Sequence, residues 1–513
     1  MLLDELVGVT EAVSATRSRL AKVDALAGLL RGLEADELAP AIGFLLAKPR
    51  QGRVGVGWRG WAAAAEAAGD APDEPTLTVA DLDRALDALQ AATGSGSAAA
   101  RAAELGTLTG RATARERDFI GRVLLGEMRT GALEGVLVDA IARAADRPGP
   151  VVRRAAMLTG DLGETARLAL VVDPAEPGAL EAVGLVVGRP VLPMLAATAA
   201  TPAEAIESTG EASVEFKLDG ARIQVHRDAD DVRVFTRNLA DITSRLPEVV
   251  EVVRGFAVDR VILDGETLAL DEEDAPRPFQ DTMSRFGAET AREALLHPWF
   301  FDVLHVDGRD LIDESLATRR AELARIAPDH RIPGEVTADP AVAERVSREA
   351  LAAGHEGVVV KAIDSTYAAG RRGSSWIKVK PVLTYDLVVL AAEWGYGRRT
   401  GLLSNLHLGA RDPDGRFGAP GGFVMVGKTF KGLTDRLLAW QTEYFPQIET
   451  HRTAQAVFVE PVTVVEIAID GVQRSTRYPG GVALRFARVK AYRDDKRAGE
   501  ADTIEALREL LPG

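Results

Sequence analysis

The spacing of hydrophobic and polar positions divides the chain into three zones. In the first zone, residues 1–180, apolar residues recur at helical spacing, most clearly over 5–33 and 117–145. A stretch rich in Gly, Ser and Ala interrupts this zone at 91–106 and is typical of a mobile loop. We therefore expect an all-α domain at 1–180 with one internal loop.

The second zone, residues 185–381, changes to a spacing of two, which is typical of strands. Short alternating runs occupy 221–227, 231–237, 260–270, 299–308, 356–362 and 376–381. Asp-Gly pairs and acidic turns between them favour antiparallel hairpins over parallel crossovers. Helical spacing returns at 242–256, 316–327 and 341–353. This pattern predicts an α+β domain with antiparallel sheets.

The third zone, residues 382–513, continues with short β runs at 384–395, 404–412, 421–430 and 463–470. They surround a single helical stretch near 433–444. Short strands with one helix suggest a small β-barrel, and an oligonucleotide-binding (OB) fold is the natural candidate. We expect this domain to swing on a joint at about Pro381 to Asp386, as hinged domains commonly do.

Length and composition agree with three globular domains. The chain has 513 residues, of which 46% are hydrophobic and 27% charged, as in ordinary globular proteins. It has no cysteine, which excludes disulfides, thiolate zinc sites and a catalytic thiol. The N-terminus lacks the basic start and apolar core of a signal peptide, and no apolar run reaches the length of about 18 residues that a membrane helix needs. We expect a cytoplasmic protein with no membrane partner.

The net charge of -15 argues at first against a polyanionic partner, but net charge averages over surfaces. Between residues 474 and 497, eight basic residues face only two acidic ones, an excess of six positive charges. A solvated face explains such a run about as well as an anion-binding surface does. The basic residues are Arg474, Arg477, Arg485, Arg488, Lys490, Arg493, Lys496 and Arg497.

Lys217 lies in the segment SVEFKLDGARIQVHR, two residues before an Asp-Gly pair and five before Arg222. A lysine amine is a covalent nucleophile only when deprotonated, and its reference pKa is about 10.4. Burial and neighbouring positive charge favour the neutral amine, and Arg222 can supply such charge. The Asp219-Gly220 turn would let Lys217 and Arg222, on neighbouring strands, face one pocket. Alone this is weak support, since surface lysines are far commoner than nucleophiles.

More distant segments add carboxylates and cations to this picture. Glu266 lies in LDGETLAL and Glu356 in EGVVVK, and two such carboxylates can hold a divalent metal. Several cations can hold phosphate, which suits transfer of a nucleotidyl or phosphoryl group to a lysine. Taken singly, each residue also fits a salt-bridged strand position. The cations are Lys361, Arg372, Lys378 and Lys380.

Together and in this order, these segments resemble the motifs of the covalent nucleotidyltransferases, which comprise ligases and mRNA capping enzymes. KLDGAR matches the nucleophile motif, LDGE the third motif, FFDVLHVDG the segment after it, EGVVVK the fourth motif and WIKVK the fifth. ALRFARVKAYRDDK resembles the sixth motif of ATP-dependent DNA ligases, with Ala487 where proline is common and Ala491 where arginine is frequent. The resemblance spans about 185–497.

The helical segment 119–144 is similar to the DNA-binding domain of DNA ligases, which capping enzymes and small viral ligases lack. The resemblance therefore implies a three-domain bacterial ATP-dependent DNA ligase of the ligase B type. It implies ATP as cosubstrate, Mg²⁺ or Mn²⁺ as metal, and nicked duplex DNA as partner. It also implies a monomer that encircles DNA as a clamp at the nucleoid.

The resemblance assigns the chemistry to Lys217, which would attack the α-phosphate of ATP, expel pyrophosphate and carry AMP as a phosphoramide. AMP would then move to the 5′-phosphate at a nick, and the 3′-hydroxyl would displace it to seal the strand. Glu215 is expected near adenine, and Phe301 is expected to stack on that base. Arg222 and Arg237 would approach the ribose and phosphates.

The remaining roles concern metal and phosphate. Glu266 would bind the ribose or a metal-bound water, and Glu356 is the expected metal ligand. Two groups of cations would act on the leaving pyrophosphate. The first, Arg372, Lys378 and Lys380, would neutralise triphosphate charge, and the second, Arg488, Arg493 and Lys496, would orient pyrophosphate in the first step only.

Other classes share parts of this pattern. A GTP-using capping enzyme or an RNA ligase would use the same lysine chemistry. A non-catalytic nucleic-acid-binding protein could keep the helical domain and the barrel without the chemistry. Nicotinamide-dependent ligases are disfavoured, because their usual four-cysteine zinc site cannot exist in this chain.

Overall fold

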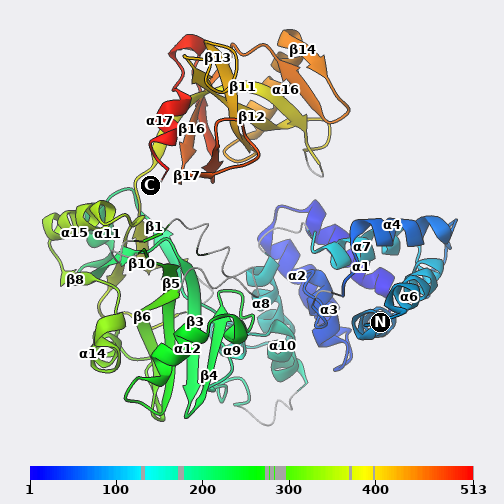
Figure 1. The fold of residues 1–513 in the computed structure, drawn as a ribbon. Coiled ribbons are helices and arrows are strands. Elements are labelled where there is room, and N and C mark those ends of the chain that lie inside the picture. Colours follow the sequence, from blue (N-terminus) through cyan, green and yellow to red (C-terminus); the bar gives the residue numbers. More distant parts are fainter. Residues whose placement is uncertain are drawn as a thin grey trace.

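The computed structural model describes residues 1–52, 54–128, 133–171, 178–271, 276–277, 282, 296–368, 372–396 and 399–511. It contains a helical unit, a central unit of two sheets with flanking helices, and a C-terminal unit built on sheets (Figure 1). Each unit has hydrophobic clusters of its own. No helix among the described residues is long and apolar enough to cross a membrane.

The helical unit confirms the all-α prediction for the first zone. Its buried core includes Leu6, Leu26, Phe44, Leu86 and Ile141. Helix α2 packs against α8, and α10 packs against α3. The helices are α1 (Leu3–Ala15), α2 (Arg19–Arg31), α3 (Leu38–Leu45), α4 (Trp58–Ala67), α5 (Val79–Ala91), α6 (Ser97–Arg111), α7 (Ala114–Leu125), α8 (Leu133–Ala144), α9 (Gly149–Thr159) and α10 (Leu162–Leu170).

The loop predicted at 91–106 is wrong over most of its length, because α6 begins at Ser97. Only 92–96 connect α5 to α6, and Gly96 adopts a left-handed φ of 89° immediately before the helix. Alanine has the highest helix propensity of all residues, so the Ala-rich run after Gly96 favours a helix. Leu105 and Leu108 anchor that helix in the core.

Helix α9 belongs to the core of the central unit as much as to the helical unit. Its Met157 and Leu158 pack in one cluster with Leu218 and Phe301 of the central unit. The Met157 carbonyl accepts a hydrogen bond from the Leu192 backbone N–H at 3.0 Å. The end of the first zone is therefore joined by side-chain packing to the unit that holds Lys217.

The central unit contains two five-stranded sheets. The first has the order β1 (Leu195–Thr198), β10 (Arg372–Val379), β9 (Gly357–Ala362), β2 (Ala212–Lys217), β8 (Gly334–Thr337). The second has the order β4 (Asp231–Thr236), β3 (Ala221–Asp228), β5 (Arg260–Ala269), β6 (Leu296–Val306), β7 (Arg309–Asp310). All strand pairs in them are antiparallel except β1 with β10, which confirms the predicted antiparallel sheets.

Helices cover both sheets. α11 (Pro202–Thr209) and α15 (Pro340–Ala352) pack on the first sheet. α12 (Pro247–Arg254) and α14 (Leu316–Ile326) pack on the second. Three of them, α12, α14 and α15, lie where helical spacing returned in the sequence, and α11 was not predicted. The chain therefore forms the α+β arrangement that its alternating pattern predicted.

The Asp219-Gly220 turn is not a hairpin, contrary to what its sequence favoured. It leads from β2 in the first sheet to β3 in the second sheet. Strand β3 already has β4 and β5 as neighbours, so no edge is left for β2. A Cβ on Gly220 would lie 2.5 Å from the Thr267 carbonyl oxygen, so only glycine fits where the turn crosses β5. The predicted hairpin geometry does hold at Asp307-Gly308, which joins β6 and β7.

The C-terminal unit confirms the strand-rich prediction for the third zone. Its main sheet has the order β13-β12-β11-β15-β14, and β16 pairs with both β11 and β19. Its main-sheet strands are β11 (Leu383–Trp394), β12 (Leu403–Asp412), β13 (Gly422–Thr429), β14 (Glu449–Arg452), β15 (Ala456–Val459), β16 (Val464–Ile469) and β19 (Arg488–Tyr492). Further elements are the pair β17 (Gly471–Arg474) and β18 (Val482–Arg485), and the helices α16 (Asp435–Tyr444) and α17 (Ile504–Arg508).

The joint between the central and C-terminal units is shorter than predicted. β10 ends at Val379 and β11 begins at Leu383, so only residues 380–382 connect them. Asp386, which we expected at the end of the joint, is a buried residue within β11 that pairs with two cations of its own unit. A strand residue held in this way cannot act as a hinge.

Candidate active site

A pocket of about 370 Å³ lies in the central unit, with walls from both sheets. Strands β2, β9 and β10 contribute from the first sheet, and β3, β5 and β6 from the second. The structure therefore brings together residues that are up to 184 positions apart in the sequence, from Met194 to Lys378. The predicted site residues that line it are Glu215, Lys217, Arg222, Arg237, Glu266, Phe301 and Lys378.

Strand alternation places Glu215 and Lys217 on one face of β2. Opposite them on β9, Val359 pairs with Glu215 and Gly357 with Lys217. Gly357 has a φ of +140°, and a Cβ there would lie 2.3 Å from the Val379 carbonyl oxygen of β10. A side chain at this position would push β10 away and widen the pocket beside Lys217.

The Lys217 ammonium forms an ion pair with the Glu356 carboxylate, at the residue just before β9. Burial lowers the pKa of Lys217, but the carboxylates of Glu356, Glu266 and Asp219 outweigh it and hold the pKa above its ordinary value. The sequence led us to expect surroundings that favour a neutral amine. In this structure that expectation is wrong, because carboxylates dominate around the amine.

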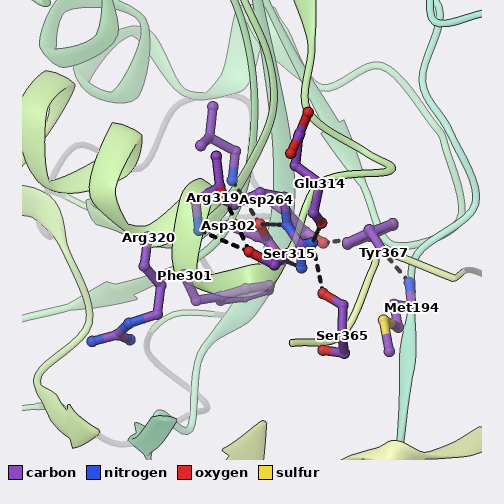
Figure 2. Close-up of polar contacts among 12 residues, drawn as sticks. Met194, Asp264, Phe301, Asp302, Glu314, Ser315, Arg319, Arg320, Ser365 and Tyr367 are labelled. Carbon is purple, nitrogen blue, oxygen red and sulfur yellow. Dashed lines mark hydrogen bonds and ion pairs between the residues drawn. The ribbon is translucent and has the colours of Figure 1, made fainter. Parts of the chain in front are cut away.

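Arg222 cannot act as the free cation that the sequence suggested, because Asp264 neutralises it. Its guanidinium donates to the two Asp264 oxygens at 3.0 and 2.7 Å and to the Met194 carbonyl at 2.7 Å. The Tyr367 hydroxyl donates to the same carboxylate at 2.6 Å, and Figure 2 shows it between Met194 and Asp264. Burial lowers the pKa of Arg222, but Asp264 more than compensates and the pKa is raised.

Glu266 is a carboxyl group that changes protonation near neutral pH. Burial raises its pKa to about 7, against the opposing effects of Lys217 and Arg222. Its Oε1 accepts a hydrogen bond from the Gly220 backbone N–H at 3.1 Å. Such a group can accept or donate a hydrogen bond to a sugar hydroxyl.

Phe301 forms part of an aromatic end of the pocket. Its ring meets Trp376 edge to face, with centroids 5.8 Å apart. The next residue on β6, Asp302, forms a fully buried ion pair with Arg319 of α14. Figure 2 shows Arg319 reaching from Asp302 to the backbone carbonyls of Glu314 and Ser365. This network fixes β6 and with it the position of the Phe301 ring.

The described residues contain no group of three or more His, Cys, Asp or Glu side chains that could hold a metal ion. They do contain the two predicted carboxylates, Glu266 and Glu356, which are close enough for Glu356 to raise the pKa of Glu266. Mg²⁺ commonly takes one or two carboxylates and completes its shell with substrate phosphates and water. The pair therefore fits a metal shared with a nucleotide.

One predicted phosphate ligand, Lys380, is not among the described residues of the pocket wall. Lys380 follows β10, where its ammonium lies 3.8 Å from Glu356 and 2.6 Å from Asp470 of the C-terminal unit. Arg372 begins β10, and its side chain lies outside the described part of the structure. Arg237 lines the pocket and is exposed, so it remains accessible to a phosphate.

The basic C-terminal residues divide between two places. Arg493 and Lys496 both pair with Asp386 inside their own unit. Arg488 pairs with Asp470 at 3.5 Å. None of the three contacts the Asp219-Gly220 turn through an ion pair among the described contacts.

Arg485 does reach that turn, and the sequence did not single it out. It lies at the end of β18 and donates to the Asp219 carboxylate at 2.6 and 3.1 Å. Asp219 is two residues from Lys217, so this contact connects the C-terminal unit to the pocket entrance. Arg485 is the first arginine of the RFAR segment, within the basic run between 474 and 497. That position is the sequence feature that could have identified it.

Comparisons with known proteins match all three zones. The family model "ATP dependent DNA ligase domain" matches residues 193–380, "ATP dependent DNA ligase C terminal region" matches 399–496 and "DNA ligase N terminus" matches 62–142. The chain is 71% identical to "Probable DNA ligase" of Pseudarthrobacter chlorophenolicus, with 100% of both chains covered. It is 58% identical to "Probable DNA ligase" of Saccharopolyspora erythraea, over 99% of this chain and 98% of that one.

A solved structure named Pmar-Lig_PreS3 has the same fold, with a TM-score of 0.61 and 18% identity over 95% of this chain and 99% of that one. The structural match covers all three units, and the alignment with the 71% identical relative covers the whole chain. On these grounds, this chain belongs to the ATP-dependent DNA ligases.

Proposed function

We propose that Lys217 is the side chain that this DNA ligase adenylates in order to seal nicks in duplex DNA. The observation that carries the proposal is the position of its amine. Lys217 lines a pocket that has an aromatic end at Phe301 and cations at Arg237 and Lys378, and its amine pairs with Glu356. An aromatic ring suits stacking on a nucleobase, and cations suit binding of phosphates.

In the first step the Lys217 nitrogen bonds to the α-phosphorus of ATP, and the bond from that phosphorus to the bridging oxygen of the β-phosphate breaks. Pyrophosphate leaves with the bonding electrons. The Lys217 ammonium gives up one proton to water before the attack, and the nitrogen gives up a second proton to water as the bond to phosphorus forms. A bound Mg²⁺ or Mn²⁺ would supply positive charge at the phosphates. Glu356 and Glu266 are the residues that would hold it.

Different pocket residues contact the base, the ribose and the phosphates of the nucleotide. Phe301 stacks on adenine, Glu215 lies at the base, and Glu266 bonds the ribose. Arg237 approaches the phosphates. Arg222 attracts phosphate less strongly, because its charge is already paired with that of Asp264. The cations Arg372, Lys378 and Lys380 complete the triphosphate site.

AMP then moves from Lys217 to the 5′-phosphate at the nick. The 3′-hydroxyl attacks that phosphate, the phosphodiester bond forms and AMP leaves. The reaction serves DNA replication, repair or recombination, which places the enzyme at the nucleoid in the cytoplasm.

The three units take separate tasks in this proposal. The helical domain, 1–180, grips duplex DNA, and the adenylation domain, 185–381, holds the nucleotide. The C-terminal domain, 382–513, has an OB fold, which is supported by a sheet whose long central strand β11 pairs with β12, β15 and β16. Together they close around DNA as a monomeric clamp.

The test is self-adenylation with α-labelled ATP, followed by denaturing electrophoresis. We expect a labelled band for the wild type and none for Lys217→Ala, because no other pocket amine has the position to replace it. Lys48→Ala is a suitable control, since Lys48 is an exposed lysine of the helical unit that pairs with Glu134. A band of wild-type intensity in Lys217→Ala would show that the nucleophile is another residue.

Nick sealing with ATP, GTP and NAD in parallel separates the competing classes. A DNA ligase of this family seals a nicked DNA duplex with ATP. Labelling by GTP instead would point to a capping enzyme, and sealing of RNA but not DNA would point to an RNA ligase.

A further inference from the structure

The carboxylate of Glu215 is held by two cations from other elements. Arg320 of α14 donates from Nη1 both to Glu215 Oε1 and to Ser213 Oγ. Lys361 of β9 places its Nζ 2.5 Å from Glu215 Oε2. The side chains of Glu215 and Lys361 are each 3% exposed and that of Arg320 is 14% exposed. Buried charges persist only when they are paired in this way.

The backbone around Glu215 leaves its side chain little freedom. On the other edge of β2, Gly334 of β8 lies directly opposite Glu215. A Cβ on Gly334 would lie 2.4 Å from the Val214 carbonyl oxygen and 3.0 Å from Glu215 Cγ. The two strands therefore enclose the Glu215 stem, and Ser213 Oγ adds a hydrogen bond to Oε1 at 2.7 Å.

Glu215 is an ionised acceptor in this setting. Burial raises the pKa of Glu215, but Lys361 and Arg320 outweigh it, so the pKa lies below its ordinary value. An ionised carboxylate accepts hydrogen bonds and donates none. Arg320 and Ser213 donate to Oε1, and the Lys361 ammonium lies against Oε2, so both oxygens of the carboxylate are held in place.

The Glu215 carboxylate lies at the aromatic end of the pocket. Glu215 lines the pocket together with Phe301, Lys361 and Trp376. The Lys361 ammonium lies 4.3 Å from the centroid of the Phe301 ring and 4.4 Å from that of Trp376. A base stacked on Phe301 would therefore present one edge to the Glu215 carboxylate.

Arg320 itself is not in the pocket wall among the described lining residues. The Arg320 side chain points in a different direction from that of its neighbour Arg319, which donates a hydrogen bond to Asp302 (Figure 2). We propose that Arg320 is a positioning residue for nucleobase selection: by holding Oε1 of Glu215 while Lys361 holds Oε2, it fixes the carboxylate that an amino group on the edge of a purine would meet.

The chemistry distinguishes two classes of purine. Adenine carries an amino group at position 6 and can donate a hydrogen bond to the Glu215 carboxylate. Guanine and hypoxanthine carry a carbonyl oxygen there, which would meet a carboxylate oxygen with no proton between them. A site built around a buried acceptor rejects a ligand that cannot satisfy it far more strongly than an apolar pocket can.

This inference rests on the proposed adenylation of Lys217, and its test uses the same full-length enzyme. Single-turnover lysine labelling is measured with ATP, with inosine triphosphate and with purine riboside triphosphate, which has hydrogen at position 6. We expect Arg320→Ala to reduce the ratio of kcat/KM for ATP over inosine triphosphate by about tenfold to hundredfold. The loss should lie mainly in KM for ATP, because Arg320 does not touch Lys217.

A purely structural role for Arg320 would lower labelling by every nucleotide and leave the ratio unchanged. Arg320→Lys should restore part of the ratio, since lysine keeps the positive charge and can donate to Glu215 and Ser213 from one nitrogen, although its shorter side chain does not place that nitrogen where Nη1 lies. Arg325→Ala is the matched control, because Arg325 lies on the same helix and pairs at the surface with Glu322.

The outcomes separate this inference from the function on which it rests. Wild-type labelling that favours ATP, with the same preference in Arg320→Ala and Arg320→Lys, would overturn the role of Arg320 and leave the adenylation intact. If Arg320→Ala does not fold, the ratio in Arg320→Lys decides: an unchanged preference overturns the proposal, and a reduced one supports it. Absence of any adduct in the wild type would overturn the proposed function as well.

Discussion

At the scale of single residues, the pocket is governed by pairing of buried charges. Lys217 pairs with Glu356, Arg222 with Asp264, and Glu215 with cations on two sides. Removing one member of a buried pair leaves the other uncompensated, and this costs more than the interaction itself is worth. Each charged residue of this pocket should therefore be tested with a conservative substitution as well as with an alanine substitution.

His226 predicts a pH dependence of stability that is separate from catalysis. Its ring is buried in β3, where Nδ1 accepts a hydrogen bond from the Gly188 N–H at 3.0 Å and Nε2 contacts Gln224 at 2.9 Å. Burial lowers the pKa of His226 from 6.5 to about 3. The unfolded chain therefore binds a proton on this ring more readily than the folded chain does.

The stabilising effect of the neutral ring is fully present above pH 6.5 and is lost as pH falls toward 3. We expect the free energy of unfolding to fall by about 1.4 kcal/mol per pH unit in this window from His226 alone. Urea unfolding at pH 7, 6 and 5 should show a shallower decline for His226→Gln than for the wild type. His297→Gln, at an exposed position of β6, should keep the wild-type slope. Equal slopes in wild type and His226→Gln would contradict the assignment.

At the scale of elements, two contacts join the C-terminal strands to the nucleotide pocket. β18 reaches the turn after β2 through Arg485 and Asp219, and the loop residue Asp470 before β17 reaches Lys380 after β10. Arg488 of β19 pairs with that same Asp470. The C-terminal unit thus meets the central unit at Asp219, two residues after Lys217, and at Lys380.

We expect Arg488→Ala to slow lysine adenylation by orders of magnitude and to leave sealing of a pre-adenylated nick comparatively intact. A cation opposite Lys217 stabilises the developing charge on pyrophosphate only in the first step. Single-turnover rates of both reactions provide the measurement. Arg452→Ala, at an exposed arginine of β14 that pairs with Glu449, is the control in the same unit.

Parallel loss of both rates in Arg488→Ala would favour a shared role in DNA binding. Lys496→Ala gives a second test, although its pairing with Asp386 means that the ammonium must leave this partner before it can reach a phosphate.

At the scale of the whole molecule, the helical unit is joined to the adenylation unit by packing and by charge. Arg154 of α9 pairs with Asp313, and Met157 and Leu158 lie in the same cluster as Leu218. Removing residues 1–180 would uncover this cluster beside Lys217. Deletion of 1–147, which retains α9 and α10, is therefore the sharper test of the DNA-binding role.

We expect the deletion of 1–147 to retain self-adenylation and to bind nicked duplex DNA more weakly than the full chain. Loss of phosphate contacts should also flatten the dependence of binding on salt concentration. Labelling with ATP serves as the internal control, because it reports that the pocket is folded. Unchanged affinity and salt slope would count against a DNA-binding role for the helical unit.

The sequence by itself determined the elements and the chemistry of the motifs. Helical spacing and alternating spacing are local properties, so most helices and strands could be predicted. KLDGAR, EGVVVK and WIKVK pointed to Lys217, Glu356 and Lys378 through their resemblance to the motifs of covalent nucleotidyltransferases. The structure places Lys217 and Lys378 in one pocket and pairs Lys217 with Glu356, while their roles in lysine adenylation stay a prediction. The loop at 91–106 failed because Gly and Ser near Gly96 obscured the helix propensity of the alanines that follow.

Only the tertiary structure decided which charges face one another. Arg320 reaches Glu215 across 105 residues, Arg485 reaches Asp219 across 266, and Arg222 is neutralised by Asp264. Coulomb energies depend on distance and burial, and neither can be obtained from residue spacing along the chain. For the same reason the raised pKa of Lys217 could not be predicted: the carboxylates that raise it converge on the amine only after the two sheets pack together.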